Sequence, residues 1–494
     1  MRDEAAVTAD LAPVEPHDRG GPRLHVPAAF GAGRAKPFFL PLPATGQRPM
    51  RFAAEGLPEG LAMDEARGLI AGCVGREGEW TVRVTARNAH GEDEAEVRII
   101  VGGRLALTPP LGWNSWNAFG REVDAARVRA AAEAMVSSGL AAHGYSHVNI
   151  DDGWQGERSG PHGALQGNEK FPDMRGLCDA VHSLGLRIGI YSTPWVKSYA
   201  GFTGGSSGEF ARSAWRQPRE AGRYFGKMPH HREDARQWAE WGFDYLKYDW
   251  NPWEVEDVEA MAEALRTCGR DIVYSLSNAA PFERAAEWAQ LAHLWRTTGD
   301  LFDTWDSLAP IAFSQDRWTP YGGPGHWNDP DMLVVGRVKW GGDARPNRLA
   351  PDEQVLHVTL WALLAAPLMV GCDLERLDDF TLRLLANDEV LEVNQDPLGR
   401  QGRCLREERR TDAGGAAVQH THVFVRELAD GSQAAALVNR GPKEETIRVT
   451  WKELALSGFR KVRDLWARKD VGRMSEALEL RVPPHGARLV RVAR

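Results

Sequence analysis

The hydrophobic and polar positions of this chain follow two different periods, and the changes between them divide it into segments. From about residue 25 to residue 103, stretches such as EWTVRVTARNAHG and DEAEVRIIVGG alternate apolar and polar residues between Gly, Asn and Pro turns. This period of two predicts a small all-β module, a sandwich, over 25–103. The residues before it, 1–24, are polar and aperiodic, and we expect them to form a disordered tail.

From residue 104 to about residue 395, short apolar runs alternate with amphipathic helix-like stretches. The apolar runs are 111–116, 147–154, 187–194, 243–250, 271–277, 293–300, 326–333 and 363–372. Strands that alternate with helices indicate parallel βαβ units, and eight of them predict a (β/α)8 TIM barrel over 104–395. After residue 395 the period of two returns, which predicts a C-terminal antiparallel β-sandwich domain over 396–494.

Polar residues end most of the eight apolar runs. They are Asn114–Trp116, Asp151–Asp152, Tyr191, Lys247–Asp249, Ser277–Asn278, Arg296–Asp300 and Asp329–Asp331. The carboxyl ends of all strands of a TIM barrel open on one face, and the active site lies there. We therefore expect these side chains to line one pocket, although a single Asp at a strand end is more often only a helix N-cap.

The carboxylates of this pocket suit the hydrolysis of a sugar bond, which needs two carboxyl groups on either side of that bond. Lys247 and Asp249 are two positions apart in a strand, so both face the pocket, and the ammonium should keep Asp249 ionised as a nucleophile. Apolar neighbours favour a raised pKa and an acid role for Asp300, whereas Arg296 opposes that rise. The pair Asp151–Asp152 suits a clamp on hydroxyl groups.

Composition excludes several classes of protein. Sixty Lys and Arg against sixty-eight Asp and Glu give a net charge of −8, which argues against a nucleic-acid or anionic-membrane partner. Five cysteines without a Cys-x-x-Cys pair predict neither a disulfide framework nor a zinc cluster. We expect no transmembrane segment and, because the N-terminus lacks the pattern of a signal peptide, a cytoplasmic protein, or a secreted or periplasmic one if the chain is trimmed.

Six motifs together resemble glycoside hydrolase family 27, the melibiase-like α-galactosidases. In chain order they are LTPPLGWNSWNAFG, YSHVNIDDGWQ, IGIYSTPW, DYLKYDWN, LWRTTGD and GHWNDPDMLVVG. The resemblance covers about 107–399, and the end of the β module is similar to Ig-like modules that precede bacterial glycosidases. It implies a retaining exo-α-galactosidase that acts on terminal α-D-galactosyl groups of an oligosaccharide or glycoconjugate, and it implies no metal or organic cofactor.

The resemblance also implies a role for each polar residue of the pocket. Asp249 would be the nucleophile and Asp300 the acid and then the base, with the two carboxyl groups about 5–5.5 Å apart. The substrate-binding residues it implies are Asp151 and Asp152 for the 6- and 4-hydroxyls, Lys247 for the 3- and 4-hydroxyls, Trp116 and Tyr191 along the sugar, Arg296 near the 2-hydroxyl, and Asp331 at the rim.

The stretch YSLSNAAP departs from the family pattern and keeps alternatives open. Ser277 and Ala280 stand where many α-galactosidases carry larger residues, and small residues there are what α-N-acetylgalactosaminidases use to admit a 2-acetamido group. A β-L-arabinopyranosidase and an isomaltose-releasing dextranase are further alternatives within the family. A non-catalytic galactoside-binding protein is less favoured, because both Asp249 and Asp300 are present. The long loop 195–231 is expected to overhang the pocket.

Overall fold

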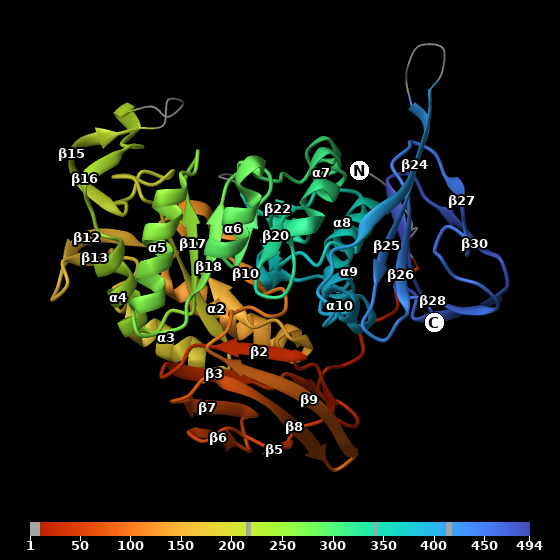
Figure 1. The fold of residues 1–494 in the computed structure, drawn as a ribbon, viewed down its shortest axis with the longest axis horizontal. Helices are drawn as coiled ribbons and strands as arrows, with labels where there is room; N and C mark the ends of the chain where they lie inside the picture. The colour runs from red at the N-terminus through yellow and green to blue at the C-terminus, as the bar shows by residue number, and fades with distance from the viewer. Residues whose placement is uncertain (1–9, 214–218, 340–342, 412–416) are drawn as a thin grey trace.

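A computed structural model describes residues 10–213, 219–339, 343–411 and 417–494 of the chain. It contains an N-terminal β module, a central barrel of parallel strands and a C-terminal β domain. Figure 1 shows the N-terminal module below the barrel and the C-terminal domain beside it.

The N-terminal module is a sandwich of a four-stranded and a three-stranded sheet. Its strands are β1 (Arg23–Leu24), β2 (Ala29–Ala32), β3 (Pro37–Pro41), β4 (Ala44–Thr45), β5 (Arg51–Glu55), β6 (Leu61–Asp64), β7 (Leu69–Cys73), β8 (Gly78–Asn88) and β9 (Gly91–Val101). The sheets have the orders β2-β9-β8-β5 and β3-β7-β6, and β1 pairs with β4. Alternate residues of β8 point inward, so that Val82, Val84 and Ala86 are fully buried in the core of the module.

Residues 10–24, which were expected to belong to a tail, lie against the folded part of the chain. Leu11 is buried in the same core as the barrel, and the backbone N–H of Ala12 donates to the carbonyl of Trp466 at 2.9 Å. The carboxylate of Glu15 forms an ion pair with Arg468 at 3.3 Å. The buried Leu11 and backbone hydrogen bonds thus hold residues 10–24 against the fold. The average polarity of residues 1–24 does not indicate these contacts.

Eight parallel strands form the barrel, each within one of the eight predicted apolar runs. They are β10 (Leu111–Asn114), β11 (His147–Asn149), β14 (Arg187–Ser192), β17 (Tyr245–Asp249), β18 (Val273–Ser277), β19 (Leu294–Arg296), β20 (Trp327–Asp329) and β23 (Leu368–Val370). Their order is β20-β19-β18-β17-β14-β11-β10-β23. A parallel bridge from Leu333, just after β20, to Val370 of β23 joins the two ends of this sheet. The predicted TIM barrel fold is confirmed.

Helices follow the barrel strands and cover them. They are α1 (Trp116–Phe119), α2 (Ala125–Ser137), α3 (Met174–Ser183), α4 (His231–Trp241), α5 (Val255–Thr267), α6 (Ala285–Leu291), α7 (Trp305–Ala312), α8 (Pro351–Leu363), α9 (Asp379–Leu385) and α10 (Asp388–Asn394). In α2, Val128, Ala131, Ala132 and Met135 are buried, as their helical spacing predicts. The Asp124 carboxylate caps α2 by accepting from the backbone N–H of Arg127 at 2.8 Å.

Short elements fill the connections of the barrel. The 3-10 helices are η1 (Gly120–Glu122), η2 (Leu140–His143), η3 (Arg219–Ala221), η4 (Phe282–Arg284), η5 (Gln315–Tyr321) and η6 (Leu374–Arg376). The two-stranded sheets pair β12 (Gln155–Ser159) with β13 (Ala164–Gly167), β15 (Ser206–Arg212) with β16 (Phe225–Pro229), and β21 (Arg337–Val338) with β22 (Arg345–Pro346). Figure 1 shows the β15–β16 hairpin rising on the upper side of the barrel, opposite the N-terminal module.

The C-terminal domain consists of a six-stranded antiparallel sheet with a two-stranded sheet packed on it. The strands are β24 (Arg403–Thr411), β25 (Ala417–Glu427), β26 (Gln433–Asn439), β27 (Glu445–Thr450), β28 (Arg460–Asp464), β29 (Lys469–Met474), β30 (Ala477–Val482) and β31 (Gly486–Val492). The larger sheet has the order β24-β25-β26-β31-β28-β29, and β27 pairs with β30. Their facing side chains, among them Val449, Val462 and Val490, form a separate core. The predicted antiparallel domain is confirmed.

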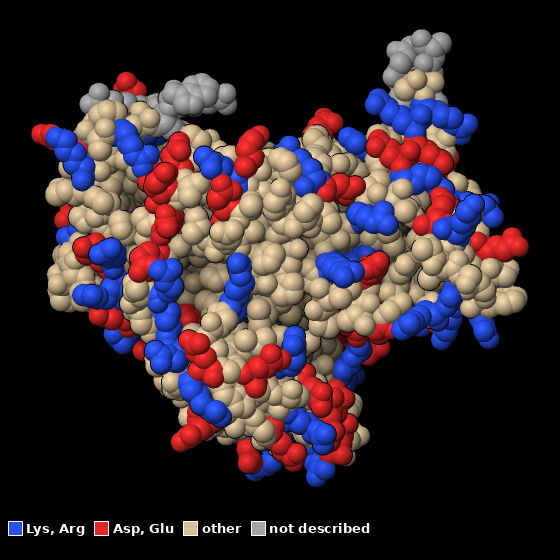
Figure 2. Space-filling model, viewed as in Figure 1, with Lys and Arg blue, Asp and Glu red and all other residues tan. Residues whose placement is uncertain are grey.

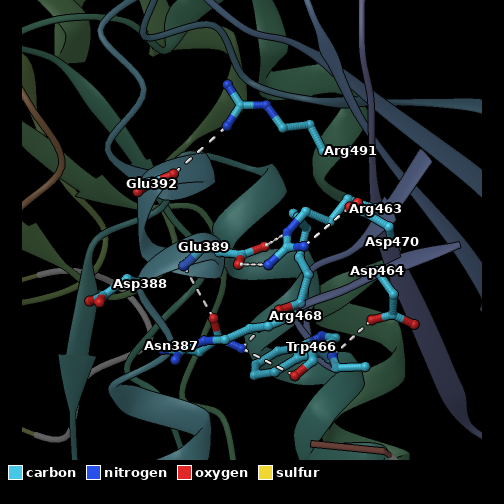
Figure 3. Close-up of polar contacts among 12 residues, drawn as sticks. Asn387, Asp388, Glu389, Glu392, Arg463, Asp464, Trp466, Arg468, Asp470 and Arg491 are labelled. Atoms are coloured by element: carbon cyan, nitrogen blue, oxygen red, sulfur yellow. Dashed lines mark hydrogen bonds and ion pairs between the residues drawn. The ribbon is translucent and has the colours of Figure 1, made fainter. Parts of the chain in front are cut away.

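Helix α10 connects the barrel to the C-terminal domain through polar contacts (Figure 3). Arg463 donates two hydrogen bonds to the Glu389 carboxylate, at 2.6 and 2.8 Å, which is the bidentate geometry that arginine favours. The side-chain amide of Asn387 donates to the carbonyl of Leu465 at 3.0 Å. These contacts fix the C-terminal domain on the side of the barrel.

The surface carries both signs of charge. Figure 2 shows acidic and basic side chains mixed over the visible face, without a patch of a single sign. All five cysteines are free thiols. Within the described residues, no helix combines the length and the apolar character that crossing a membrane requires.

Candidate active site

The carboxyl ends of the barrel strands carry the predicted site residues. Tyr191 lies in β14, Lys247 and Asp249 in β17, Ser277 at the end of β18 and Arg296 at the end of β19. The remaining members follow strands directly: Trp116 opens α1, Asp151 and Asp152 follow β11, Asp300 follows β19, and Asp331 follows β20. The barrel therefore gathers on one face residues that are more than 200 positions apart in sequence.

Asp249 is the last residue of β17 and is 7% exposed. The Tyr191 hydroxyl, from the neighbouring strand β14, donates to its Oδ2 at 3.0 Å. The side-chain amide of Asn278 donates to its Oδ1. Each carboxyl oxygen of Asp249 thus accepts a hydrogen bond, and the two bonds fix the orientation of the carboxyl group.

Burial raises the pKa of Asp249 to about 7, and the negative charges of Asp300 and Asp151 add to this effect. The charge of Lys247 and the hydrogen bond from Tyr191 act in the opposite direction. Lys247 therefore lowers the pKa of Asp249, as expected, but burial raises it by more. The Lys247 ammonium donates to Asp151 Oδ2 at 2.8 Å, so its nearest anion is that neighbour rather than Asp249. The spacing of Lys247 and Asp249 in the sequence predicts that both face the site. It does not show that Asp151 binds the ammonium in place of Asp249.

Asp300 lies at the mouth of the site, with 60% of its side chain exposed. Arg296, which is almost fully buried, donates to Asp300 Oδ1 at 3.1 Å and forms an ion pair with Asp331 Oδ1 at 2.8 Å. Burial alone would raise the pKa of Asp300, but the charges of Arg296 and Lys247 outweigh it and hold that pKa below the ordinary value. The sequence indicates that Arg296 opposes a raised pKa of Asp300. In the structure the charges of Arg296 and Lys247 outweigh the effect of burial.

Asp331 occupies the other side of the same guanidinium. It is buried, and its Oδ2 accepts from the backbone N–H of Leu301 at 2.7 Å. Burial raises its pKa to about 6, with the charges of Asp300 and Asp329 acting in the same direction and that of Arg296 opposing them. Its φ of 108° is a left-handed conformation that is unusual for a residue other than glycine. Arg296 thus links two carboxylates, one buried and one at the entrance.

Asp151 and Asp152 are both buried, directly after β11 ends at Asn149. Because the strand has ended, the two carboxylates leave a turn in different directions. The hydroxyl of Ser115 accepts from the backbone N–H of Asp151 at 2.9 Å, while Asp151 Oδ2 binds Lys247. Burial raises the pKa of Asp152, against hydrogen bonds from the backbone of Ala200 and from neighbouring side chains. The bend that two adjacent inward carboxylates require is present.

Three residues that support the site had been given no role of their own. Asn278 has a left-handed φ of 73°, and it is this conformation at the end of β18 that accompanies its contact with Asp249. Gln155 donates to Asp152 Oδ1 at 2.9 Å. Ser115 accepts from Asp151, as described above. The polar strand ends Ser277–Asn278 and Asn114–Trp116 contain Asn278 and Ser115, whereas the contact of Gln155 depends on a turn that no periodicity shows.

The loop after β14 reaches the site at Asp152, which it contacts through Ser198 and Ala200. The backbone N–H of Ala200 donates to Asp152 Oδ2 at 2.9 Å, and the adjoining Tyr199 ring packs edge-on against Trp195 with 5.1 Å between ring centroids. The guanidinium of Arg223 covers the Tyr199 ring at 4.9 Å and donates to the Tyr199 carbonyl at 3.0 Å. The start of the predicted overhanging loop is therefore anchored to the site, while residues 214–218 lie outside the described chain.

Ser277 is 2% exposed and sits beside Asp249 in the register of β17 and β18. Ala280 follows within the same connection, and its backbone N–H donates to the Arg296 carbonyl at 2.8 Å. Two small side chains thus lie on the edge of the site between the carboxyl group of Asp249 and Arg296. Trp116 is partly buried at the start of α1.

Comparisons with known proteins agree with this arrangement. A family model described as Alpha galactosidase A matches residues 108–215 and 218–396, one for the alpha galactosidase C-terminal beta sandwich domain matches 418–492, and one for an Ig domain matches 22–102. Alpha-galactosidase 2 of Arabidopsis thaliana is 36% identical over 81% of this chain and 93% of its own length.

Two solved structures extend the likeness to three dimensions. A provisionally named alpha-galactosidase/melibiase from Bacteroides fragilis is 33% identical, with a TM-score of 0.84 over 97% of this chain and 99% of that one. A β-L-arabinopyranosidase from Geobacillus stearothermophilus, in complex with arabinose, is 29% identical, with a TM-score of 0.68 over 79% of this chain and 98% of that one. The chain therefore belongs to the alpha-galactosidase A family of glycoside hydrolases, family 27, with an Ig-like module before the barrel.

Proposed function

We propose that this protein is a retaining exo-α-galactosidase that removes terminal α-D-galactosyl groups. The observation that carries the proposal is the pair of carboxyl groups after β17 and β19, the strands on either side of β18. Asp249 is buried and held by two donors, whereas Asp300 lies exposed at the entrance of the same pocket. A carboxyl group fixed below the sugar and one facing solvent match the nucleophile and the acid/base of a double-displacement mechanism.

In the first step, Asp249 attacks the anomeric carbon while Asp300 gives a proton to the leaving oxygen. The donors Tyr191 and Asn278 orient Asp249 for this attack. In the second step, Asp300 takes a proton from water, which attacks the glycosyl–Asp249 ester and releases galactose with retained configuration. The two displacements need no cofactor.

Substrate binding should move a proton from Asp249 to Asp300. Without substrate, the pKa of Asp249 is raised and that of Asp300 is lowered, so Asp249 takes up a proton more readily than Asp300. A sugar seated over Asp300 removes water from the 60% of its side chain that is exposed, and this desolvation raises the pKa of Asp300. The proton then lies on the group that must donate it, and Asp249 becomes the free carboxylate.

The other polar groups orient the sugar ring. Asp151, Asp152 and Lys247 form a connected group that offers two acceptors and a donor to the 3-, 4- and 6-hydroxyls. Burial makes these groups selective, because a sugar that leaves one of them unpaired loses the binding energy of a buried polar contact. Arg296 and Asp331 occupy the side of the 2-hydroxyl.

A second candidate function is α-N-acetylgalactosaminidase activity. It is supported by the small side chains of Ser277 and Ala280 beside Asp249 and Arg296, because a 2-acetamido group needs space at that edge. The likeness to the β-L-arabinopyranosidase from Geobacillus stearothermophilus supports a third candidate activity, hydrolysis of β-L-arabinopyranosides. Arabinopyranose has the ring of galactose without the hydroxymethyl group.

A hydrolysis panel separates these functions. The purified chain is given p-nitrophenyl α-galactoside, α-N-acetylgalactosaminide, β-L-arabinopyranoside and α-glucoside at equal concentration. The proposal expects the α-galactoside to have the highest kcat/KM and the α-glucoside to be essentially inert. A dominant rate on the 2-acetamido or the arabinosyl substrate would replace it with the corresponding alternative. Binding of galactose without hydrolysis of any substrate would indicate a non-catalytic galactoside-binding protein.

A further inference from the structure

Three side chains of metal-ligand type meet at the base of the barrel, on the face opposite the active site. His25 follows β1 in the N-terminal module, His143 ends η2 before β11, and Asp388 opens α10. The distance to Asp388 Oδ1 is 2.6 Å from His143 Nδ1 and 3.5 Å from His25 Nδ1. One ligand atom from each of the three lies within 4.8 Å of the others. Segments from the N-terminal module, the barrel and α10 thus converge on one point.

The cluster is buried. The side chains of His143, Asp388 and His25 are only 4%, 8% and 11% exposed. Among the described residues, the buried Nε2 of His143 has no hydrogen-bond partner. Nδ1, the nitrogen 2.6 Å from Asp388 Oδ1, is the ligand atom of the cluster, so the site is supported by the burial of its three side chains and not by this Nε2, which lies on the other edge of the ring.

The charge states of two members suit a cation. Burial lowers the pKa of His25 to about 4, although the charge of Asp388 opposes this, so the imidazole is neutral at pH 7. Burial would raise the pKa of Asp388, but the hydrogen bond from His143 and the charge of Arg23 act against burial, and that pKa is lowered. A neutral imidazole and an ionised carboxylate are the forms that bind metals.

The space around the cluster leaves room for further ligands. His25, His143 and Asp388 line a cavity of about 560 Å³ between the N-terminal module and the base of the barrel. A cavity of this size with polar groups in its wall can hold the water that completes a coordination shell. Three protein ligands with a water in the fourth position form a common tetrahedral arrangement.

Arg23, the cation that contacts Asp388, is already paired. Arg23 contacts Asp388 Oδ2 at 3.4 Å and Glu392 at 2.6 Å, so Oδ1, the oxygen that faces both histidines, stays available. Figure 3 shows that the Asp388 carboxylate points away from the Glu389–Arg463 contact, so this ion pair does not compete for it. Asp388 and Glu392 carry two negative charges against the one positive charge of Arg23, so these three side chains together remain negative.

We propose that His25, His143 and Asp388 form a Zn²⁺-binding site that fastens the N-terminal module and α10 to the base of the barrel. Two imidazoles and one carboxylate are a donor set that zinc prefers over calcium or magnesium. A second cluster, Glu407, His420 and His422, has similar ligands, but the guanidinium groups of Arg409 and Arg440 share the pocket beside it and repel a cation. That second cluster therefore serves as a control.

The proposal is tested by zinc binding to the full chain after treatment with a chelator and dialysis. Titration with ZnCl2 in competition with a chromophoric chelator should show one high-affinity equivalent, and saturation should raise Tm. His25→Gln and Asp388→Asn should each weaken the affinity at least about tenfold, since even indirect contacts to a metal site contribute that much. His25→Gln is the primary variant because His143 is the more deeply buried and its replacement risks misfolding; far-ultraviolet circular dichroism verifies the fold of each variant.

His420→Gln provides the matched control and should leave stoichiometry and affinity unchanged. Substitution by Co²⁺ gives an independent readout, because a tetrahedral site with two imidazoles absorbs visible light in the wild type and should not do so in His25→Gln. The absence of a bound equivalent, unchanged affinity in folded His25→Gln, or loss of zinc in His420→Gln would each overturn the proposal.

Discussion

Replacing Asp300 with Asn should move the acidic limb of the pH–rate profile to lower pH. Asp249 must be ionised to attack, so activity falls as pH decreases through the pKa of its carboxyl group, which is about 7 in the structure. The negative charge of Asp300 contributes to that raised value, and Asp300→Asn removes it without changing the size of the side chain. The pKa of Asp249 should therefore fall.

The size of this shift follows from the separation and the screening. At the roughly 5–5.5 Å expected between the carboxyl groups of a retaining pair, Coulomb's law gives about 0.8 kcal/mol in water and about 3 kcal/mol at an effective dielectric constant of about 20. These limits correspond to roughly 0.6 and 2.3 pKa units. Because 60% of the Asp300 side chain is exposed, solvent screens the charge, and a shift of about one unit is expected.

An activated aryl galactoside is the correct substrate for this measurement, because its departure needs little protonation by Asp300. The profile of kcat/KM from pH 4 to pH 9 is compared for the wild type, Asp300→Asn and Asp306→Asn, which removes an exposed carboxylate from α7 and should shift the limb by less than about 0.2 unit. In the wild type the limb belongs to the coupled pair, whereas in Asp300→Asn it reports Asp249 alone. A limb that stays in place, or one that moves to higher pH, would refute this coupling of the two carboxyl groups.

Three further changes test other parts of the structure. Tyr191→Phe removes the hydroxyl that donates to Asp249, so kcat should fall about ten- to a hundredfold and the acidic limb should move to higher pH; a change below twofold in steady-state assays would contradict this role. Ser277→Glu should suppress any hydrolysis of the 2-acetamido substrate, which the p-nitrophenyl panel detects, and unchanged activity would place that group elsewhere. Glu389→Ala breaks the bidentate contact with Arg463 and should lower the free energy of unfolding by about 1–3 kcal/mol in urea titration; an unchanged midpoint would show that the contact is screened.

Periodicity was sufficient to predict the fold because the barrel strands are buried on both sides. Most of these strands, such as Leu111–Asn114 and Tyr245–Asp249, end in polar residues, and these polar ends indicate where one face of the barrel opens. The segment from residue 10 to residue 24 could not be predicted in this way. Leu11 is a single apolar side chain in a polar stretch, and its packing depends on the C-terminal domain more than 450 positions away.

The chemistry of the site was predictable in residue type but less so in electrostatics. The two-residue spacing of Lys247 and Asp249 correctly placed both on the same side of a strand. It did not reveal that the ammonium binds Asp151, or that burial raises the pKa of Asp249. Such effects depend on distances between strands that are far apart in sequence. Asn278 was visible only as a polar strand end, because asparagine adopts a left-handed φ more often than most residues but its type alone does not show where this occurs.

Trapping the covalent intermediate would test directly whether Asp249 is the nucleophile of a retaining α-galactosidase. A fluorinated galactosyl fluoride, which forms the glycosyl-enzyme rapidly and releases it slowly, is incubated with the wild type and with Asp249→Asn, and proteolytic peptides are analysed by mass spectrometry. We predict one added fluorogalactosyl group per chain, on the peptide and the residue Asp249, and none in Asp249→Asn. An adduct on another carboxylate, or galactoside hydrolysis by Asp249→Asn within tenfold of the wild-type rate, would contradict the assignment.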